Sequence, residues 1–452
     1  MTMIHARRAR LPGGWRRDVL LRIEGGRIAD LSTAPPPPDA ARVDTLLPAL
    51  ANLHSHSFQR AMAGMTERRV AGRPSFWTWR ELMYRFAMKI APDELEAIAA
   101  LAFMEMLETG FSSVGEFHYL HHQESGAPYA SIDELSQRIF AAALQTGIGL
   151  THLPVLYVYG GAGGKALEPQ QARFGNDVDR FCRLVGAAKA SIARLGADAR
   201  VGIAPHSLRA ASPEDLSRAL AAHPEGPVHI HAAEQPKEVA EVMAHLGARP
   251  VEWLLRNAGV DRRWCLVHAT QMTPSETRDL AASGAIAGLC PITEANLGDG
   301  PFNGPDYFAA GGAFGVGSDS NVRISMTEEL RMLEYSQRLR DLSRTVLAGS
   351  GSVGETLYLG AAKGGAAALG REAGAIEAGR IADLVAIDGN APSLCALGDD
   401  RLLDGLCFAA GDDVVTDVWS AGRHMVRGGR HVAREAIIAA YRKAIASLVA
   451  GA

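Results

Sequence analysis

Two histidines, His54 and His56, stand one residue apart at the end of the apolar segment 47–53. Side chains two residues apart on a β-strand point to the same side, so this strand end would bring two imidazoles to one point. That arrangement suits two ligands of a metal ion. The pair alone is a weak signal, because ordinary core or surface histidines show the same spacing, and its weight depends on what stands at the other strand ends.

Residues 46–365 alternate helix-like and strand-like segments. Proline at the start and glycine after the end mark several helices, which we expect at 92–109, 177–194, 213–222, 236–246, 274–282 and 327–342. Short apolar strands are expected at 46–54, 112–118, 149–157, 200–205, 227–231, 264–268, 285–290 and 314–318. Strand–helix units repeated in this way over roughly 300 residues predict an α/β fold, a (β/α)8 TIM-type barrel, with a doubly wound sheet as the alternative.

In such a barrel, the residues that do chemistry gather at the carboxyl ends of the strands. The residues expected there are polar and mostly ionisable: His54, His56, Glu116, His118, Tyr119, His206, Arg209, His229, His231, Glu234, His268 and Asp319. Asp319 ends a glycine-rich strand, and a carboxylate buried at a barrel mouth without a cation or a proton would be costly, so we interpret it as a metal ligand or a catalytic group. A structural role is preferred for His229, His121, His122 and His152.

The composition describes a globular chain of 452 residues, with 47% apolar residues, 21% charged residues and a formal net charge of −4. Such a chain can bury a large core and form more than one domain. Nothing indicates a basic surface for nucleic acid, and no apolar run approaches the roughly 20 residues of a membrane helix. The N-terminus lacks the apolar core of a secretory signal and the five cysteines are scattered, so we expect reduced thiols and a cytoplasmic protein.

The two ends of the chain share a different pattern. Residues 19–31 alternate apolar and polar side chains around the pair Gly25-Gly26, which is typical of a β-hairpin. The sequence Gly-Arg-Ile-Ala-Asp-Leu occurs at residues 26–31 and again at 379–384. We therefore expect a small β-sandwich domain built from residues 1–45 plus 370–452, with the catalytic barrel at 46–369 between them.

This set of residues resembles the amidohydrolase superfamily. The resemblance rests on His54-x-His56, on His231 and His268 after later strands, and on Asp319, and it covers nearly the whole chain. It implies a metal-dependent hydrolase with a (β/α)8 barrel and a β-domain formed from both chain ends.

The resemblance also implies one divalent metal ion, whose ligands would be His54, His56, His231 and Asp319. Members with two ions place a bridging lysine or glutamate at the end of the fourth strand, whereas this chain has Pro205-His-Ser-Leu-Arg209 there. Three neutral imidazoles and a carboxylate suit Zn²⁺ and leave a position for a water molecule whose pKa the cation lowers. Fe²⁺ is the alternative.

Glu234 follows His231 by three residues, a spacing similar to that of the deaminase branch of the superfamily. The implied catalytic residues are Glu234, His268 and Asp319. His268 and Asp319 would take the proton of the water, and Glu234 would deliver a proton to the leaving nitrogen. The expected products are ammonia and a carbonyl compound.

A closer resemblance, to the formiminoglutamate deiminases of histidine degradation, rests on the segments 58–64, 76–83, 115–119, 205–209 and 290–300. It implies that Arg80 and Arg209 each grip one carboxylate of a small dicarboxylate substrate, since a guanidinium pairs bidentately with a carboxylate. Gln59, Tyr119 and His206 would complete the substrate pocket. The expected reaction converts N-formimino-L-glutamate to N-formyl-L-glutamate and ammonia.

Two other classes stay open at this point. A nucleobase or related aromatic aminohydrolase would use the same metal and Glu234 but would need stacking surfaces instead of paired arginines. A non-catalytic scaffold with the same fold should have lost metal ligands, and this chain keeps all of them. A homodimer is expected because it is a common assembly of large barrels.

Overall fold

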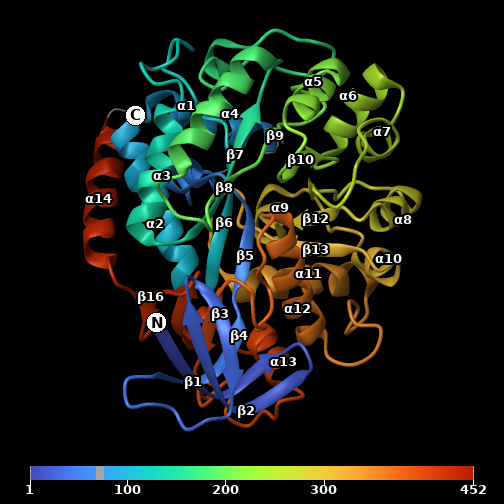
Figure 1. Ribbon diagram of the computed structural model, residues 1–452. Helices are drawn as coiled ribbons and strands as arrows, with labels where there is room; N and C mark the ends of the chain where they lie inside the picture. Colours follow the sequence, from blue (N-terminus) through green and yellow to red (C-terminus); the bar gives the residue numbers. More distant parts are fainter. Residues whose placement is uncertain (1, 68–75, 451–452) are drawn as a thin grey trace.

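The computed structural model describes residues 2–67 and 76–450. A parallel barrel forms its upper part, and strands from both chain ends form a second sheet below it (Figure 1). The barrel strands are, in order, β5 (Leu50–Ser55), β6 (Phe111–His118), β7 (Gly149–Leu156), β8 (Arg200–Val201) with β9 (Ala204–Pro205), β10 (Val228–Ala232), β11 (Trp264–His268), β12 (Ile286–Leu289) and β13 (Ala313–Val316). The predicted barrel is confirmed.

The barrel closes through backbone hydrogen bonds at two points. After β13, the Asp319 N–H donates to the His54 carbonyl, and the His56 N–H donates to the Asp319 carbonyl, both at 2.9 Å. On the other side, the His231 N–H donates to the His206 carbonyl at 3.1 Å, which joins the fourth strand position to β10. These links bring residues far apart in sequence to one end of the barrel.

Helices surround the barrel strands. They are α1 (Phe76–Lys89), α2 (Pro92–Glu108), α3 (Glu134–Thr146), α4 (Val178–Ile192), α5 (Pro213–Ala222), α6 (Pro236–Leu246), α7 (Pro250–Asn257), α8 (Pro274–Ser283), α9 (Pro291–Leu297), α10 (Gly304–Ala309), α11 (Met326–Asp341) and α12 (Val353–Ala368). Proline in the first turn follows a capping side chain at Ser212 and Thr273, which explains why α5 and α8 begin as predicted. Within residues 2–67 and 76–450, none of the helices has the length and hydropathy that crossing a membrane requires.

The second sheet joins the two chain ends in the order β17-β16-β15-β14-β4-β1-β2-β3. Its strands are β1 (Thr2–Leu11), β2 (Gly14–Glu24), β3 (Arg27–Ser32), β4 (Ala41–Pro48), β14 (Leu384–Ile387), β15 (Val415–Ser420), β16 (Arg423–Arg427) and β17 (Arg430–His431). Strand β4 pairs with β1 on one side and β14 on the other, so the N- and C-terminal segments share one core. The β-rich unit from both ends is therefore confirmed, while its boundaries at 45/46 and 369/370 stay predictions.

The strand expected at 46–54 differs from the structure. Residues 46–48 end β4 and pair with β14, whereas β5 begins at Leu50. The Ala49 N–H donates to the Asp383 carbonyl at 3.1 Å, so the chain passes between the two sheets without a loop. Both halves are buried and apolar, which made them one run in the sequence. The C-terminal helix α14 (Arg434–Ala450), which is not among the predicted helices, packs on α2 of the barrel (Figure 1).

A buried ion pair stabilises the contact between barrel and second sheet. Arg371 is 4% exposed and donates to both carboxylate oxygens of Asp383 at 2.9 to 3.1 Å, and to the carbonyl of Asp198 at 2.7 Å. Asp383 also accepts the Ala421 N–H at 2.8 Å. The pair thus links the end of α12, the segment before β8 and the start of β14.

We expect Arg371→Met to lower the free energy of unfolding by about 3 to 5 kcal/mol, because it leaves the buried Asp383 carboxylate without its cation. Urea denaturation measures this change. Arg380→Met is the control: Arg380 pairs with Glu377 where the two side chains are 45% and 54% exposed, and losing such a pair should cost less than about 1 kcal/mol. Equal effects of the two substitutions would contradict the role of Arg371.

Candidate metal and catalytic site

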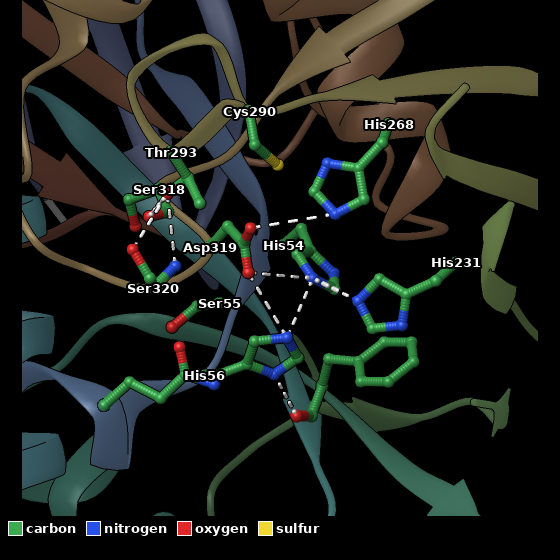
Figure 2. Close-up of polar contacts among 12 residues, drawn as sticks. His54, Ser55, His56, His231, His268, Cys290, Thr293, Ser318, Asp319 and Ser320 are labelled. Atoms are coloured by element: carbon green, nitrogen blue, oxygen red, sulfur yellow. Dashed lines mark hydrogen bonds and ion pairs between the residues drawn. The ribbon is translucent and has the colours of Figure 1, made fainter. Parts of the chain in front are cut away.

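Four side chains converge at the carboxyl end of the barrel (Figure 2). His54 lies on β5 and His56 directly follows that strand, His231 lies on β10, and Asp319 lies in the segment after β13. The Nε2 atom of His54 lies 3.2 Å from Nε2 of His56 and 3.2 Å from Nε2 of His231. Asp319 Oδ1 lies 3.5 Å from His54 Nε2 and 3.3 Å from His56 Nε2. The four residues predicted as metal ligands therefore meet at one buried point.

These separations fit a tetrahedral metal ion. Donors at 2.0–2.1 Å from zinc would lie about 3.3 to 3.4 Å from one another. His56 Nδ1 donates to the Phe117 carbonyl at 2.9 Å, and His231 Nδ1 donates to the His206 carbonyl at 3.0 Å. A carbonyl oxygen can only accept, so each proton sits on Nδ1 and each Nε2 lone pair is directed at the shared point. The donor set thus suits a divalent cation.

The charges of the four groups agree with this fit. Burial lowers the pKa of His54 to about 3 and also lowers the pKa values of His56 and His231, which keeps the imidazoles neutral. Burial opposes ionisation of Asp319, but its contacts with His54 and His268 outweigh that effect and hold its pKa below the usual value. Neutral imidazoles and an ionised carboxylate are the forms that bind metal.

Glu234 and His268 lie beside this cluster. His268 Nε2 is 3.8 Å from Glu234 Oε1 and 3.7 Å from Asp319 Oδ2. Burial raises the pKa of Glu234 to about 7, and the charge of Asp319 adds to the rise. Burial opposes protonation of His268, yet the carboxylates of Glu234, Glu294 and Asp319 raise its pKa to about 10. A carboxyl group that titrates near neutral pH suits proton transfer.

A cavity opens onto the cluster. It is lined by all five residues predicted to bind substrate: Gln59, Arg80, Tyr119, His206 and Arg209. It is also lined by His56, His231, Glu234, His268 and Asp319. Predicted substrate and catalytic residues thus share one space, although their roles stay predictions.

The cavity is also lined by residues that were not predicted to bind substrate: Trp79, Met83, Tyr84, Tyr157, Phe174 and Leu297. Arg80 Nη2 donates to the Tyr157 hydroxyl at 3.3 Å, and its guanidinium carbon lies 5.0 Å from the centre of the Tyr84 ring. Tyr84 follows Arg80 by four residues on α1, and Tyr157 directly follows a barrel strand. Both tyrosines could have been predicted from the sequence, since residues four apart share a helix face and the residues at strand ends face the site.

The histidines interpreted as structural lie outside the cavity lining. His229 Nε2 donates to the Ala368 carbonyl at 2.8 Å, and His152 Nε2 contacts the Ser136 hydroxyl at 2.9 Å. The ring centre of His118 lies 5.4 Å from that of His121 and 5.2 Å from that of His152. His118, His121 and His152 thus form a cluster of buried rings, while His229 bonds to the end of α12.

Comparisons with known proteins agree with a metal-dependent amidohydrolase site. The model of the amidohydrolase family matches residues 45–425, and the model of the formimidoylglutamate deiminase HutF N-terminal domain matches residues 1–41. A Pseudomonas aeruginosa protein named formimidoylglutamate deiminase is 48% identical, covering 99% of this chain and 100% of that protein. A solved amidohydrolase structure from Brucella melitensis is 48% identical with a TM-score of 0.95, covering 99% and 100%. An adenosine deaminase structure from Xanthomonas campestris with bound zinc is 24% identical with a TM-score of 0.81, covering 99% and 98%.

The closure of the barrel beside the site leaves no room at Gly317. A Cβ atom there would lie 2.7 Å from both the backbone N and the backbone O of His54. We expect Gly317→Ala to cost about 1 to 3 kcal/mol of unfolding free energy, as overpacking does, and to displace His54. Denaturation and a crystal structure measure the two effects.

Gly186→Ala provides the control. Gly186 lies inside α4, and a Cβ atom there meets no heavy atom within 4 Å. This substitution should stabilise the protein by about 0.5 to 1 kcal/mol, because alanine favours a helix more than glycine. A Gly317→Ala variant of unchanged stability and unchanged His54 position would refute the packing argument.

Proposed function

Since the chain belongs to the amidohydrolase family, we propose that it hydrolyses N-formimino-L-glutamate to N-formyl-L-glutamate and ammonia, a step of histidine degradation. The full-length relative at 48% identity and the match over residues 1–41 support this reaction. The structural observation that carries it is the presence of Arg80 and Arg209 in the cavity that also contains Glu234 and His268. Two guanidinium groups suit a substrate with two carboxylates.

The proposal includes one divalent metal ion bound by His54, His56, His231 and Asp319. We favour zinc over Fe²⁺, because a site of imidazoles and a carboxylate binds zinc more tightly in the usual order of affinities. When bound, the cation would make a water molecule nucleophilic near neutral pH and so prepare it to attack the formimino carbon.

The chain's own residues would manage the protons. The charge of the bound cation would lower the raised pKa of the His268 ring and leave Nε2 free to accept a proton. His268 Nε2 and Asp319 Oδ2, 3.7 Å apart, would then be placed to accept the proton that the water loses. Glu234 Oε1, 3.8 Å from the same Nε2, would pass a proton to the nitrogen that leaves as ammonia. The pKa of about 7 for Glu234 allows it to gain and release a proton within one cycle.

The other cavity residues would hold the glutamate part. Arg80 and Arg209 would each pair with one carboxylate, while Tyr157 and Tyr84 hold the Arg80 guanidinium. Gln59 Nε2 donates to the Tyr119 hydroxyl at 2.6 Å, so these two side chains would act as one polar group on the substrate. His206 lines the cavity together with both arginines, its ring centre lies 4.9 Å from that of His231, and it would contact the substrate there.

The proposed location is the cytoplasm and the proposed assembly is a homodimer. All five cysteines are free thiols, which supports a reducing compartment. Sedimentation velocity measures the assembly and would contradict the homodimer by showing a monomer at working concentrations.

An ammonia-release assay tests the reaction directly. N-Formimino-L-glutamate should be turned over with a higher kcat/KM than N-formimino-L-aspartate, guanine or cytosine. A preference for guanine or cytosine would replace the proposal with an aromatic aminohydrolase. Absence of turnover in metal-loaded protein with all four substrates would favour a scaffold role.

Two substitutions separate the metal from the proton transfer. Glu234→Gln keeps the size of the side chain but cannot carry the proton, so kcat should fall by roughly 10² to 10⁴-fold while one metal per chain remains. His231→Ala should lose the metal. Elemental analysis and steady-state kinetics measure both results. Two metals per chain, or a Glu234→Gln variant of near-normal kcat, would refute the assignment.

The arginines should determine the dicarboxylate preference. Arg80→Met or Arg209→Met would leave a desolvated substrate carboxylate unpaired, which typically costs about 2 to 5 kcal/mol. We therefore expect kcat/KM for N-formimino-L-glutamate to fall by roughly 30-fold to several thousand-fold, with metal content unchanged. A substrate with an amide in place of one carboxylate should lose less from the matching substitution. Normal kinetics in both variants would exclude the arginine contacts.

A further inference from the structure

His268 stands at a strained point of the backbone. β11 ends at His268, where φ is +69°, and Ala269 follows with φ of +52°. Residues with a Cβ atom rarely adopt this left-handed conformation, and they keep it only where surrounding contacts hold it. The orientation of the His268 ring therefore depends on its contacts rather than on a relaxed strand.

One such contact comes from Glu294, which the proposed reaction does not use. Glu294 is 5% exposed and His268 is 1% exposed. Its Oε1 atom lies 3.3 Å from His268 Nδ1 and also accepts the Cys290 N–H at 2.8 Å. Helix α9 begins directly after β12, so its first turn brings Glu294 beside β11. The second hydrogen bond fixes the carboxylate relative to the start of that helix.

This contact determines which ring nitrogen can do chemistry. An ionised carboxylate only accepts hydrogen bonds, so a ring that pairs with Glu294 carries a proton on Nδ1. The other nitrogen, Nε2, is then the one that faces Glu234 at 3.8 Å and Asp319 at 3.7 Å. A carboxylate on one side of an imidazole sets tautomer and orientation in other hydrolytic sites in the same way.

We propose that Glu294 is a positioning residue that holds His268 with Nδ1–H towards α9 and Nε2 towards the reacting atoms. The proposal rests on the function proposed above, in which His268 Nε2 accepts a proton. Glu294 acts through its hydrogen bond and needs no contact with substrate.

Glu329 offers a matched control. It is 0% exposed and accepts the Ile292 N–H at 3.0 Å, on the same first turn of α9. Among the described residues its hydrogen bond is to this backbone group and not to His268. Removing either glutamate leaves one N–H of the turn without its acceptor, so the two losses of stability should be comparable while only one affects the ring.

Four variants of the zinc-loaded full chain test the proposal: Glu294→Met, Glu294→Asp, Glu294→Gln and Glu329→Met. Glu294→Met removes the acceptor. Glu294→Asp keeps the charge, but its side chain is one methylene shorter, so the oxygen lies farther from His268 Nδ1. Both should lower kcat by roughly 10²-fold, with KM within about threefold of the wild type. Glu294→Gln keeps an oxygen acceptor and should stay within about tenfold of the wild-type kcat, as should Glu329→Met. All four should retain one metal per chain.

The order of the variants decides the outcome. A Glu294→Gln variant slower than Glu294→Asp would mean that charge acts and not the hydrogen bond, which overturns the proposal. Normal kcat in Glu294→Met or Glu294→Asp would overturn it too, as would an equal loss in Glu329→Met. If Glu294→Met does not fold, the comparison of Asp with Gln still decides.

A crystal structure of Glu294→Asp gives a readout that needs no substrate. The His268 ring should leave its position, with Nε2 no longer between Glu234 and Asp319, whereas the ring in Glu329→Met should stay. An unmoved ring in Glu294→Asp would refute the positioning role. A wild-type enzyme inactive on N-formimino-L-glutamate would refute the proposed function alone, because the position of the His268 ring in the variant structures would still test the role of Glu294.

Discussion

The two backbone hydrogen bonds between Asp319 and the end of β5 are the interaction on which the site depends. They pair the last barrel strand position with the first, so residues 265 positions apart, His54 and Asp319, become neighbours. The same pairing places the Asp319 carboxylate against the imidazoles of His54 and His56. Closure of the barrel and assembly of the donor cluster are therefore one structural event, and the absence of a side chain at Gly317 is what lets the strands approach.

The loops that carry the polar groups are held by buried carboxylates. Glu116 accepts the backbone N–H and the hydroxyl of Ser57, next to His56. Glu238 accepts the N–H of Glu234 at 2.9 Å, beside Ala233, whose φ is +54°. Burial raises the pKa of Glu116 to about 7, a sign of how costly such groups are to bury. The hydrogen bonds of Glu238 offset the left-handed backbone at Ala233, a conformation that costs about 1 to 3 kcal/mol. Buried carboxylates that need not touch substrate thus stabilise the site.

The sequence could predict much of this arrangement because the signals were local. The period of a strand places His54 beside His56, and the strand-end rule places Glu234, His268 and Asp319 at the same face. The resemblance to amidohydrolases is confirmed by the match over residues 45–425. The division of segment 46–54 between two sheets could not be predicted, since its partners, β14 and β6, lie far away in sequence.

The buried glutamates that hold the loops of the site could not be predicted for a related reason. Glu238 and Glu329 stand on amphipathic helices, where a glutamate usually faces solvent. Their burial follows from tertiary approach: Glu329 on α11 reaches the Ile292 N–H on α9 only because the two helices pack side by side. Glu294, in contrast, lies in a segment that the sequence analysis singled out, but its contact with His268 required β11 and β12 to be adjacent.

The aromatic wall of the cavity bears on the choice between a dicarboxylate and an aromatic substrate. Tyr84, Tyr119, Tyr157 and Phe174 could be taken for a stacking surface. Yet the Tyr157 hydroxyl accepts hydrogen bonds from Arg80 at 3.3 Å and Gln171 at 3.1 Å, and Tyr84 has its ring against the Arg80 guanidinium. The Tyr84 face and the Tyr157 hydroxyl therefore both orient the Arg80 cation. A guanidinium with a fixed plane loses little freedom when it pairs bidentately with a carboxylate, so Tyr84 and Tyr157 favour an anionic substrate.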